Sequence, residues 1–124
     1  MTKLRDEDAT KERLEALVAR LVKRLDLGWL TWVNRFETSK DGDRVACSTV
    51  ADWEYRQVSM KWMLAMVASM TDEELEALCI HEMVHGLIAP LWVEIPTKYE
   101  QRLNKVMEFS TENVARAILA ALQK

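Results

Sequence analysis

The feature that most constrains the fold of this chain is an apolar segment that begins with a helix cap. Thr71 and Glu74 have the spacing of a capping box, in which each side chain bonds the other residue's backbone N–H. Residues 75–93 then contain only four polar side chains: Glu76, His81, Glu82 and His85. A helix that is apolar nearly all round is buried, and proline ends a helix. We therefore predict a buried helix from Thr71 to about Ala89, stopped by Pro90.

The polar residues inside this helix form the pattern His-Glu-x-x-His at His81, Glu82 and His85. Positions i and i+4 lie on one helix face, so both imidazoles can reach a single metal ion. Glu82 lies beside the metal without binding it, where it can take a proton from a zinc-bound water. Two imidazoles and a carboxylate are costly to bury without partners, and a shared Zn²⁺ removes that cost. The pattern predicts one zinc ion per chain, held by His81 and His85, with Glu82 as the catalytic base.

The competing interpretation treats both histidines as core residues bonded to the backbone, with Glu82 paired to an arginine. For a lone histidine this interpretation would be the better one. We favour the metal site because the five-residue pattern falls on a capped, buried helix and uses the only two histidines of the chain.

A catalytic zinc site needs a third protein ligand beside an open position. No third histidine exists and no aspartate follows Asp72, which leaves four downstream glutamates: Glu94, Glu100, Glu108 and Glu112. Glu94 is too close to the end of the metal helix to fold back easily. Glu108 and Glu112 lie one turn apart on the predicted last helix, and spacing alone does not separate them. Either could instead be a surface acid that pairs with Lys105 or Arg116.

The remaining chain predicts an α+β fold with a small sheet. Apolar periodicity indicates a first helix over Thr10–Leu27, stopped by Gly28. Three strands are expected over Trp29–Glu37, Arg44–Ala51 and Tyr55–Leu64, with a turn at Ser39–Asp43 and a last helix over Lys98–Leu122. The third strand has the cleanest alternation, with one face made of Val58, Met60, Trp62 and Leu64. With 124 residues, the chain fits a single domain over residues 1–124.

Composition excludes several classes of protein. A net charge of −3 argues against a nucleic-acid binder, and no apolar run is long enough to predict a membrane span. The charged N-terminus does not resemble a signal peptide, and Cys47 and Cys79 are too few for a disulfide scaffold, so we expect a cytoplasmic protein. We expect Cys79 to be a small core residue. The five tryptophans are likewise expected mainly in the core.

The segment from Asp52 to Leu91 (DWEYRQVSMKW…TDEELEALCIHEMVHGLIAPL) resembles the small zincin-like, gluzincin-type metallopeptidases of phage and prophage genomes. The later run STENVARAIL resembles a second signature of that family, in which a glutamate begins a run of small and apolar residues. This resemblance implies Glu112 as the third zinc ligand, with Glu108 as second choice. One departure is that the family often carries paired acids where this chain has Thr111 and Glu112.

The resemblance implies a minimal zincin-like domain and a hydrolase that cleaves peptide bonds. In zincins an extended substrate adds to a sheet edge above the metal helix, so we expect a peptide or protein substrate along the Tyr55–Leu64 strand. Tyr55 and Tyr99 are candidate oxyanion stabilisers on chemistry alone, although packing is the simpler role for each. The alternatives are a catalytically silent zinc module with the same fold and a metal-free helical interaction protein. The oligomeric state, the substrate and the cleavage preference are left open.

Overall fold

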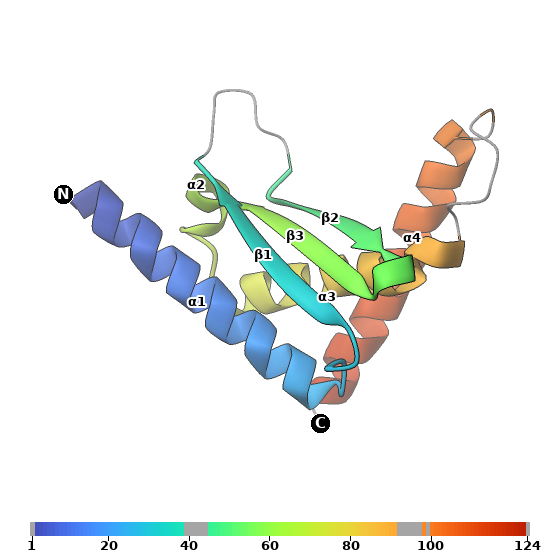
Figure 1. Cartoon of the computed structure of the whole chain (residues 1–124), viewed down its shortest axis with the longest axis horizontal. Helices are drawn as coiled ribbons and strands as arrows, with labels where there is room; N and C mark the ends of the chain where they lie inside the picture. The colour runs from blue at the N-terminus through green and yellow to red at the C-terminus, as the bar shows by residue number, and fades with distance from the viewer. Residues whose placement is uncertain (1, 39–44, 92–97, 99, 124) are drawn as a thin grey trace.

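The computed structural model describes residues 2–38, 45–91, 98 and 100–123, without the side chains of residues 2–6 and 100. In chain order the elements are α1 (Thr2–Arg24), β1 (Thr31–Glu37), β2 (Cys47–Asp52), the 3₁₀ turn η1 (Trp53–Tyr55), β3 (Gln57–Met63), α2 (Leu64–Val67), α3 (Asp72–Ile88), the 3₁₀ turn η2 (Ala89–Leu91) and α4 (Glu100–Leu122). This arrangement confirms the predicted α+β class and layout (Figure 1). The predicted turn at Ser39–Asp43 lies outside the described residues.

The sheet has the strand order β1-β3-β2, so β3 is its central strand. β3 pairs in parallel with β1, as in Trp32 opposite Val58, and antiparallel with β2, as in Thr49 opposite Met60. The expectation that a substrate adds to the Tyr55–Leu64 strand is therefore wrong, because both sides of β3 already carry hydrogen-bonded partners. The free edges of this sheet belong to β1 and β2. Strand order depends on long-range pairing, which the alternation within one strand does not encode.

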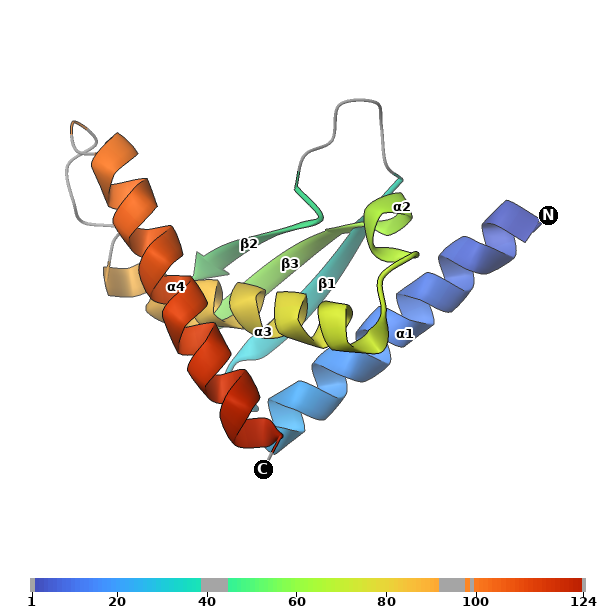
Figure 2. The same cartoon turned by 180° about the vertical axis from the view of Figure 1, so that it is seen from behind.

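Helices cover one face of the sheet. Val58, Met60 and Trp62 alternate along β3 and are buried on this face, as the sequence pattern predicts. Seen from behind, α3 and α4 lie in front of the sheet with α1 beside them (Figure 2). The core joins Met60 and Trp62 to Leu14 and Leu21 of α1 and to apolar residues of α3. α3 therefore lies between the sheet and α4, and contacts both.

The first helix ends earlier than predicted, and Asp26 rather than Gly28 supplies the stop. Asp26 has a left-handed backbone (φ 56°), and its N–H bonds the carbonyl of Lys23 at 3.3 Å. The N–H of Leu27 bonds the carbonyl of Val22 at 2.8 Å. These two bonds form a Schellman motif, which satisfies the last carbonyls of the helix. The chain then turns into β1.

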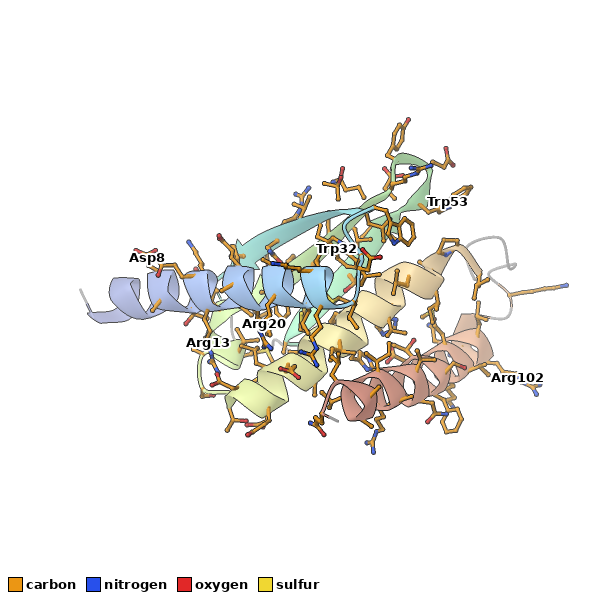
Figure 3. The ribbon with its side chains drawn as sticks, turned by 90° about the horizontal axis from the view of Figure 1, so that it is seen from below. Asp8, Arg13, Arg20, Trp32, Trp53 and Arg102 are labelled. Carbon is orange, nitrogen blue, oxygen red and sulfur yellow. The ribbon has the colours of Figure 1, made fainter. Side chains whose placement is uncertain are left out.

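The tryptophans divide between core and surface. Trp62 is fully buried and its Nε1 donates to Asn34 Oδ1 at 3.0 Å, while half-buried Trp32 donates to the carbonyl of Leu27. Trp29 and Trp53 are 61% and 49% exposed, so the expectation of a core position is wrong for both. Trp53 lies at the far end of the sheet from Asp8 (Figure 3). Trp92 is outside the described residues.

Two ion pairs connect α1 to the first half of α3. Arg13 reaches Asp72 at 2.7 Å and Arg20 reaches Glu76 at 3.0 Å, and both arginines project from α1 toward α3 in Figure 3. Exposed pairs of this kind contribute about 0–1 kcal/mol each, so apolar packing is the main link between the two helices. Over the described part of the chain, no helix has both the length and the apolarity that a membrane span requires.

Candidate metal centre

The helix that carries the histidines begins as predicted. The N–H of Glu74 donates to Thr71 Oγ1 at 3.1 Å, and Glu74 Oε1 accepts from the N–H of Thr71 at 3.0 Å. α3 runs from there to Ile88 and holds His81 and His85 one turn apart, with ring centroids 4.8 Å apart and the rings edge to face. Both side chains are at least four-fifths buried. The two imidazoles thus share one partly covered face of α3.

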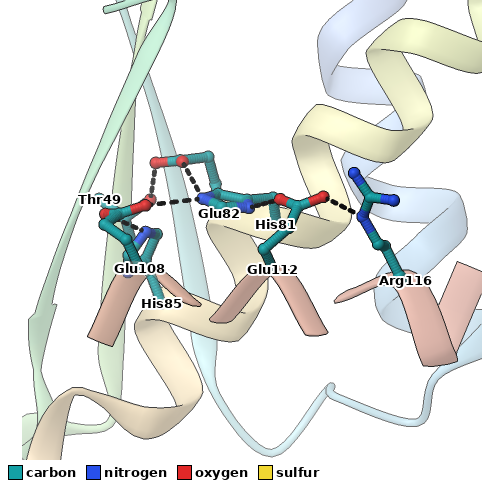
Figure 4. Close-up of polar contacts among 7 residues, drawn as sticks. All are labelled: Thr49, His81, Glu82, His85, Glu108, Glu112 and Arg116. Carbon is teal, nitrogen blue, oxygen red and sulfur yellow. Dashed lines mark hydrogen bonds and ion pairs between the residues drawn. The ribbon is translucent and has the colours of Figure 1, made fainter. Parts of the chain in front are cut away.

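A carboxylate from α4 lies close to the Nε2 atom of each ring. Glu108 Oε1 lies 3.0 Å from His85 Nε2, and Glu108 Oε2 lies 3.4 Å from His81 Nε2 (Figure 4). One ligand atom from each of these three residues falls within 4.8 Å of the others. This separation suits two imidazoles and a carboxylate around one metal ion. The structure therefore brings together His81, His85 and Glu108.

Glu112 lies near the same histidine but contacts its other nitrogen. Glu112 Oε2 is 2.7 Å from His81 Nδ1, and Arg116 Nε donates to Glu112 Oε1 at 2.9 Å. The hydrogen bond from Arg116 is the main cause that lowers the pKa of Glu112; burial opposes this shift, and the hydrogen bond and charge of His81 add to it. In the tautomer with its proton on Nδ1, His81 donates a hydrogen bond to the ionised Glu112, which leaves the Nε2 lone pair on the side of Glu108. The geometry thus favours Glu108 over Glu112 as the third ligand, and the assignment itself stays a prediction.

Glu82 is buried beside this cluster, and its two oxygens face different groups. Oε1 accepts a hydrogen bond from Thr49 Oγ1 at 2.8 Å, while Oε2 lies 4.0 Å from His81 Nε2. Burial raises the pKa of Glu82; the Thr49 hydrogen bond and the charge of His81 oppose the shift, and Glu108 adds to it. A buried glutamate with a raised pKa holds a proton more readily than an exposed one, and its free oxygen lies on the ligand side, as a general base requires.

His85 is suited to metal binding by its protonation state. Burial lowers the pKa of His85, which outweighs the opposing charge of Glu108, and the neighbouring His81 lowers it further. A neutral imidazole is the form that binds a metal. The Nε2 atom of a neutral His85 offers a lone pair to a metal in the tautomer that carries the proton on Nδ1.

A cavity of about 730 Å³ opens onto the cluster between β2, α3 and α4. Its wall includes Val45, Cys47 and Thr49 on the β2 side and Met107 on α4. The N–H of Met63 donates to the carbonyl of Ala46, so the backbone N–H and C=O groups of the even-numbered residues of β2 point toward β3. Backbone groups alternate in direction along an antiparallel strand, so those of Cys47 and Thr49 point to the free edge. The cavity therefore runs beside an edge of β2 that has no strand partner among the described residues.

Both cysteines are buried and free of disulfides. Burial is the main cause that raises the pKa of each thiol, to about 12 for Cys79, and the charge of Glu82 adds to both shifts. Such thiols stay protonated at neutral pH and are poor metal ligands. The prediction that Cys79 is a core residue is confirmed.

Several sequence candidates lie away from the cluster or outside the described part of the chain. Tyr55 is 76% exposed and does not line the cavity, so it neither packs in the core nor reaches the site. Tyr99, Glu94 and the side chain of Glu100 are not described. The sequence reading missed Thr49, although the alternation of β2 would have placed it on the same face as buried Cys47.

Comparisons with known proteins found no matching family model, no matching curated protein and no matching solved structure. The resemblance to zincin-like peptidases thus stays a prediction from the sequence.

Proposed function

We propose that this chain is a zinc-dependent metallopeptidase. The observation that carries the proposal is the convergence of His81 Nε2, His85 Nε2 and the Glu108 carboxylate on one point, with Glu82 Oε2 beside it. Two imidazoles and one carboxylate are the ligand set of several catalytic zinc sites. We propose His81, His85 and Glu108 as the ligands of one Zn²⁺ per chain, with Glu112 orienting His81.

The donor chemistry fits a catalytic site better than a structural one. Structural zinc sites are closed and rich in cysteine, whereas Cys47 and Cys79 are protonated and outside the cluster. Glu82 adds a fourth polar group that the three ligands do not need. A buried carboxylate is costly without a function, and a base beside the metal provides one.

Zinc, when bound, polarises the scissile carbonyl and makes the attacking water more acidic. In the proposed reaction Glu82 Oε2 accepts the proton that the water loses as it attacks the peptide carbonyl. The same carboxyl group then passes this proton to the leaving amine nitrogen, which restores Glu82 to its ionised form.

The proposed substrate is a peptide or an extended segment of a protein. The free edge of β2 borders the cavity and can hydrogen-bond an extended chain as an added strand. β2 takes the place of the Tyr55–Leu64 strand in this scheme, because β3 has no free edge. The two free cysteines fit a reducing setting, so we propose that the protein acts in the cytoplasm.

Zinc content tests the metal site. Purified protein is expected to contain about one zinc per chain by elemental analysis, and to regain it after chelation and reconstitution. His81→Ala and His85→Ala should each remove it. A wild-type protein that takes up no zinc would refute the metal site and leave a metal-free interaction protein as the better interpretation.

Glu82→Gln tests catalysis separately from metal binding. This variant keeps the shape of the side chain and cannot accept the proton, so we expect full zinc content and loss of hydrolysis on a peptide library read by mass spectrometry. Activity equal to wild type would exclude Glu82 as the base. Zinc binding without cleavage of any library peptide by the wild-type protein would favour the silent zinc module.

A further inference from the structure

The carboxylate of Glu82 is held asymmetrically. Its Oε1 atom receives the hydroxyl hydrogen bond of Thr49, and its Oε2 atom lies on the side of His81 Nε2 (Figure 4). The terminal torsion of a glutamate is broad and roughly two-fold, so an untethered carboxylate turns easily. A hydrogen bond to one oxygen therefore fixes the orientation of the carboxylate and directs its other oxygen toward the proposed metal.

Thr49 reaches Glu82 because α3 approaches β2 closely at one point. Gly86 lies one turn after Glu82, and a Cβ atom built on it would be 3.6 Å from Thr49 Cγ2 and 2.6 Å from Val58 Cγ1. No larger residue fits there without a shift of the buried Val58 side chain. The short helix-to-strand distance thus lets a side chain as short as threonine bond the base.

We propose that Thr49 is a positioning residue for Glu82, which fixes the carboxylate so that Oε2 receives the proton during hydrolysis. This inference rests on the proposed zinc peptidase function. The backbone N–H and C=O of Thr49 also point to the free edge of β2. A peptide bound along that edge therefore contacts the same residue that orients the base, which ties substrate placement to the position of Oε2.

The test compares Thr49→Val, which keeps the shape and loses the hydroxyl, with Thr49→Ser, which keeps the hydroxyl. Thr31→Val is the matched control, because it makes the same change at an exposed position of β1 that does not line the cavity. Each variant is measured for zinc content, for thermal stability and for binding of acetohydroxamic acid by calorimetry. A hydroxamic acid binds zinc as its anion and gives its proton to a nearby base, so its affinity reports on Glu82 without turnover.

We expect Thr49→Val to keep zinc and to bind acetohydroxamic acid about tenfold more weakly, in line with the loss of a hydrogen bond to a charged group. Peptide hydrolysis should lose about tenfold in kcat with little change in KM, because the base and not substrate binding is affected. Thr49→Ser should restore both quantities to within about threefold, and Thr31→Val should match wild type.

The outcomes separate this inference from the proposed function. Zinc-loaded Thr49→Val with wild-type hydroxamate affinity would overturn the role of Thr49 and leave the peptidase proposal intact. Failure of Thr49→Ser to restore binding would overturn it too, by showing that shape and not the hydroxyl matters. If Thr49→Val does not fold, the test uses Thr49→Ser, which keeps the hydroxyl. A hydroxamate affinity of Thr49→Ser as weak as that of Glu82→Gln would then overturn the role of Thr49. Absence of zinc from the wild-type protein would overturn both proposals together.

Discussion

Glu108 and Glu112 lie one turn apart on α4 and contact opposite nitrogens of His81. Glu108 faces Nε2 of His81 and of His85, whereas Glu112 and its partner Arg116 hold Nδ1. A residue that binds the metal contributes more to affinity than one that orients a ligand, whose loss costs about 10- to 100-fold. Their two substitutions should therefore have different effects on zinc.

We expect Glu108→Gln to weaken zinc binding more than hundredfold and Glu112→Gln to weaken it about tenfold. The measurement is a competition titration against a chelator of known zinc affinity. Glu73→Gln, an exposed acid on α3, serves as the control and should leave the affinity unchanged. A larger loss in Glu112→Gln would return the ligand role to Glu112, as the family resemblance implies.

The sequence predicts the two histidine ligands and the base but does not decide between the two acids. His81, Glu82 and His85 share one helix, so their relative geometry follows from helix periodicity. Glu108 and Glu112 belong to another helix, whose rotation about its axis is set by packing of Ala115 and Thr111 against the rest of the protein. Positions i and i+4 of a helix differ by about 40° of rotation and about 6 Å along the axis, so the way α4 packs on α3 decides which of the two acids meets the Nε2 atoms. Thr49 was missed for the same reason, because it comes from a separate strand.

At the scale of elements, the capping box sets where α3 begins. Thr71→Ala removes the side-chain acceptor for the N–H of Glu74 and should lower the free energy of unfolding by about 1 kcal/mol. Chemical denaturation at pH 7 measures this loss. Thr71→Ser, which keeps the acceptor, should lie close to wild type, and an equal loss in both variants would contradict a capping role.

The cap also has a defined pH dependence. Hydrogen bonds from the backbone and side chain of Thr71 lower the pKa of Glu74 below its ordinary value of 4.5. A carboxyl group with a lowered folded-state pKa stabilises the fold above its unfolded pKa, and that contribution is lost as the pH falls through the folded value. The difference in stability between wild type and Glu74→Ala should therefore be present at pH 7 and shrink as the pH falls below the ordinary pKa of 4.5. A difference that grows toward acid pH would contradict this sign.

Gly86 marks the closest approach of α3 to the sheet. Alanine is favoured over glycine inside a helix by about 1 kcal/mol, but a Cβ here would lie 2.6 Å from Val58 Cγ1. We expect Gly86→Ala to destabilise the protein by about 1–2 kcal/mol, because overpacking exceeds the helix preference. In a Val58→Ala background the same change should stabilise, since the obstructing methyl groups are gone. A double-mutant cycle by denaturation measures the coupling, and additive effects would show that the contact is not limiting.

Local patterns predict most elements, and their failures have local causes. The helices α1, α3 and α4 and the three strands are recognisable because their apolar residues recur with period 3.6 or 2. α2 is four residues long and leaves no periodic trace. The end of α1 was misplaced because Asp26 takes the left-handed position that glycine usually holds. The central place of β3 is a property of the whole sheet.

At the scale of the whole molecule, the proposed zinc site joins α3 to α4, a helix that buries few of its own side chains. Among the described side chains of α4, only Thr111 and Ala115 are buried, whereas α1 buries five: Thr10, Leu14, Leu17, Val18 and Leu21. α4 packs mainly on α3, and Glu108 joins the histidines of α3 from α4. Zinc would therefore act as a cross-link that holds α4 in place.

We expect removal of zinc to loosen α4 more than α1 or the sheet. A ligand that binds only the folded state raises the free energy of unfolding by about 2.7 kcal/mol when its free concentration is one hundred times Kd. When this contribution is lost, segments with few buried contacts open first. Hydrogen exchange should therefore speed up after chelation mainly in the α4 amides, with β3 amides little changed. Glu108→Gln should give the apo pattern even with zinc present, while Glu73→Gln should behave as wild type. Uniform acceleration across α1, β3 and α4 would show instead that zinc stabilises the fold as one cooperative unit.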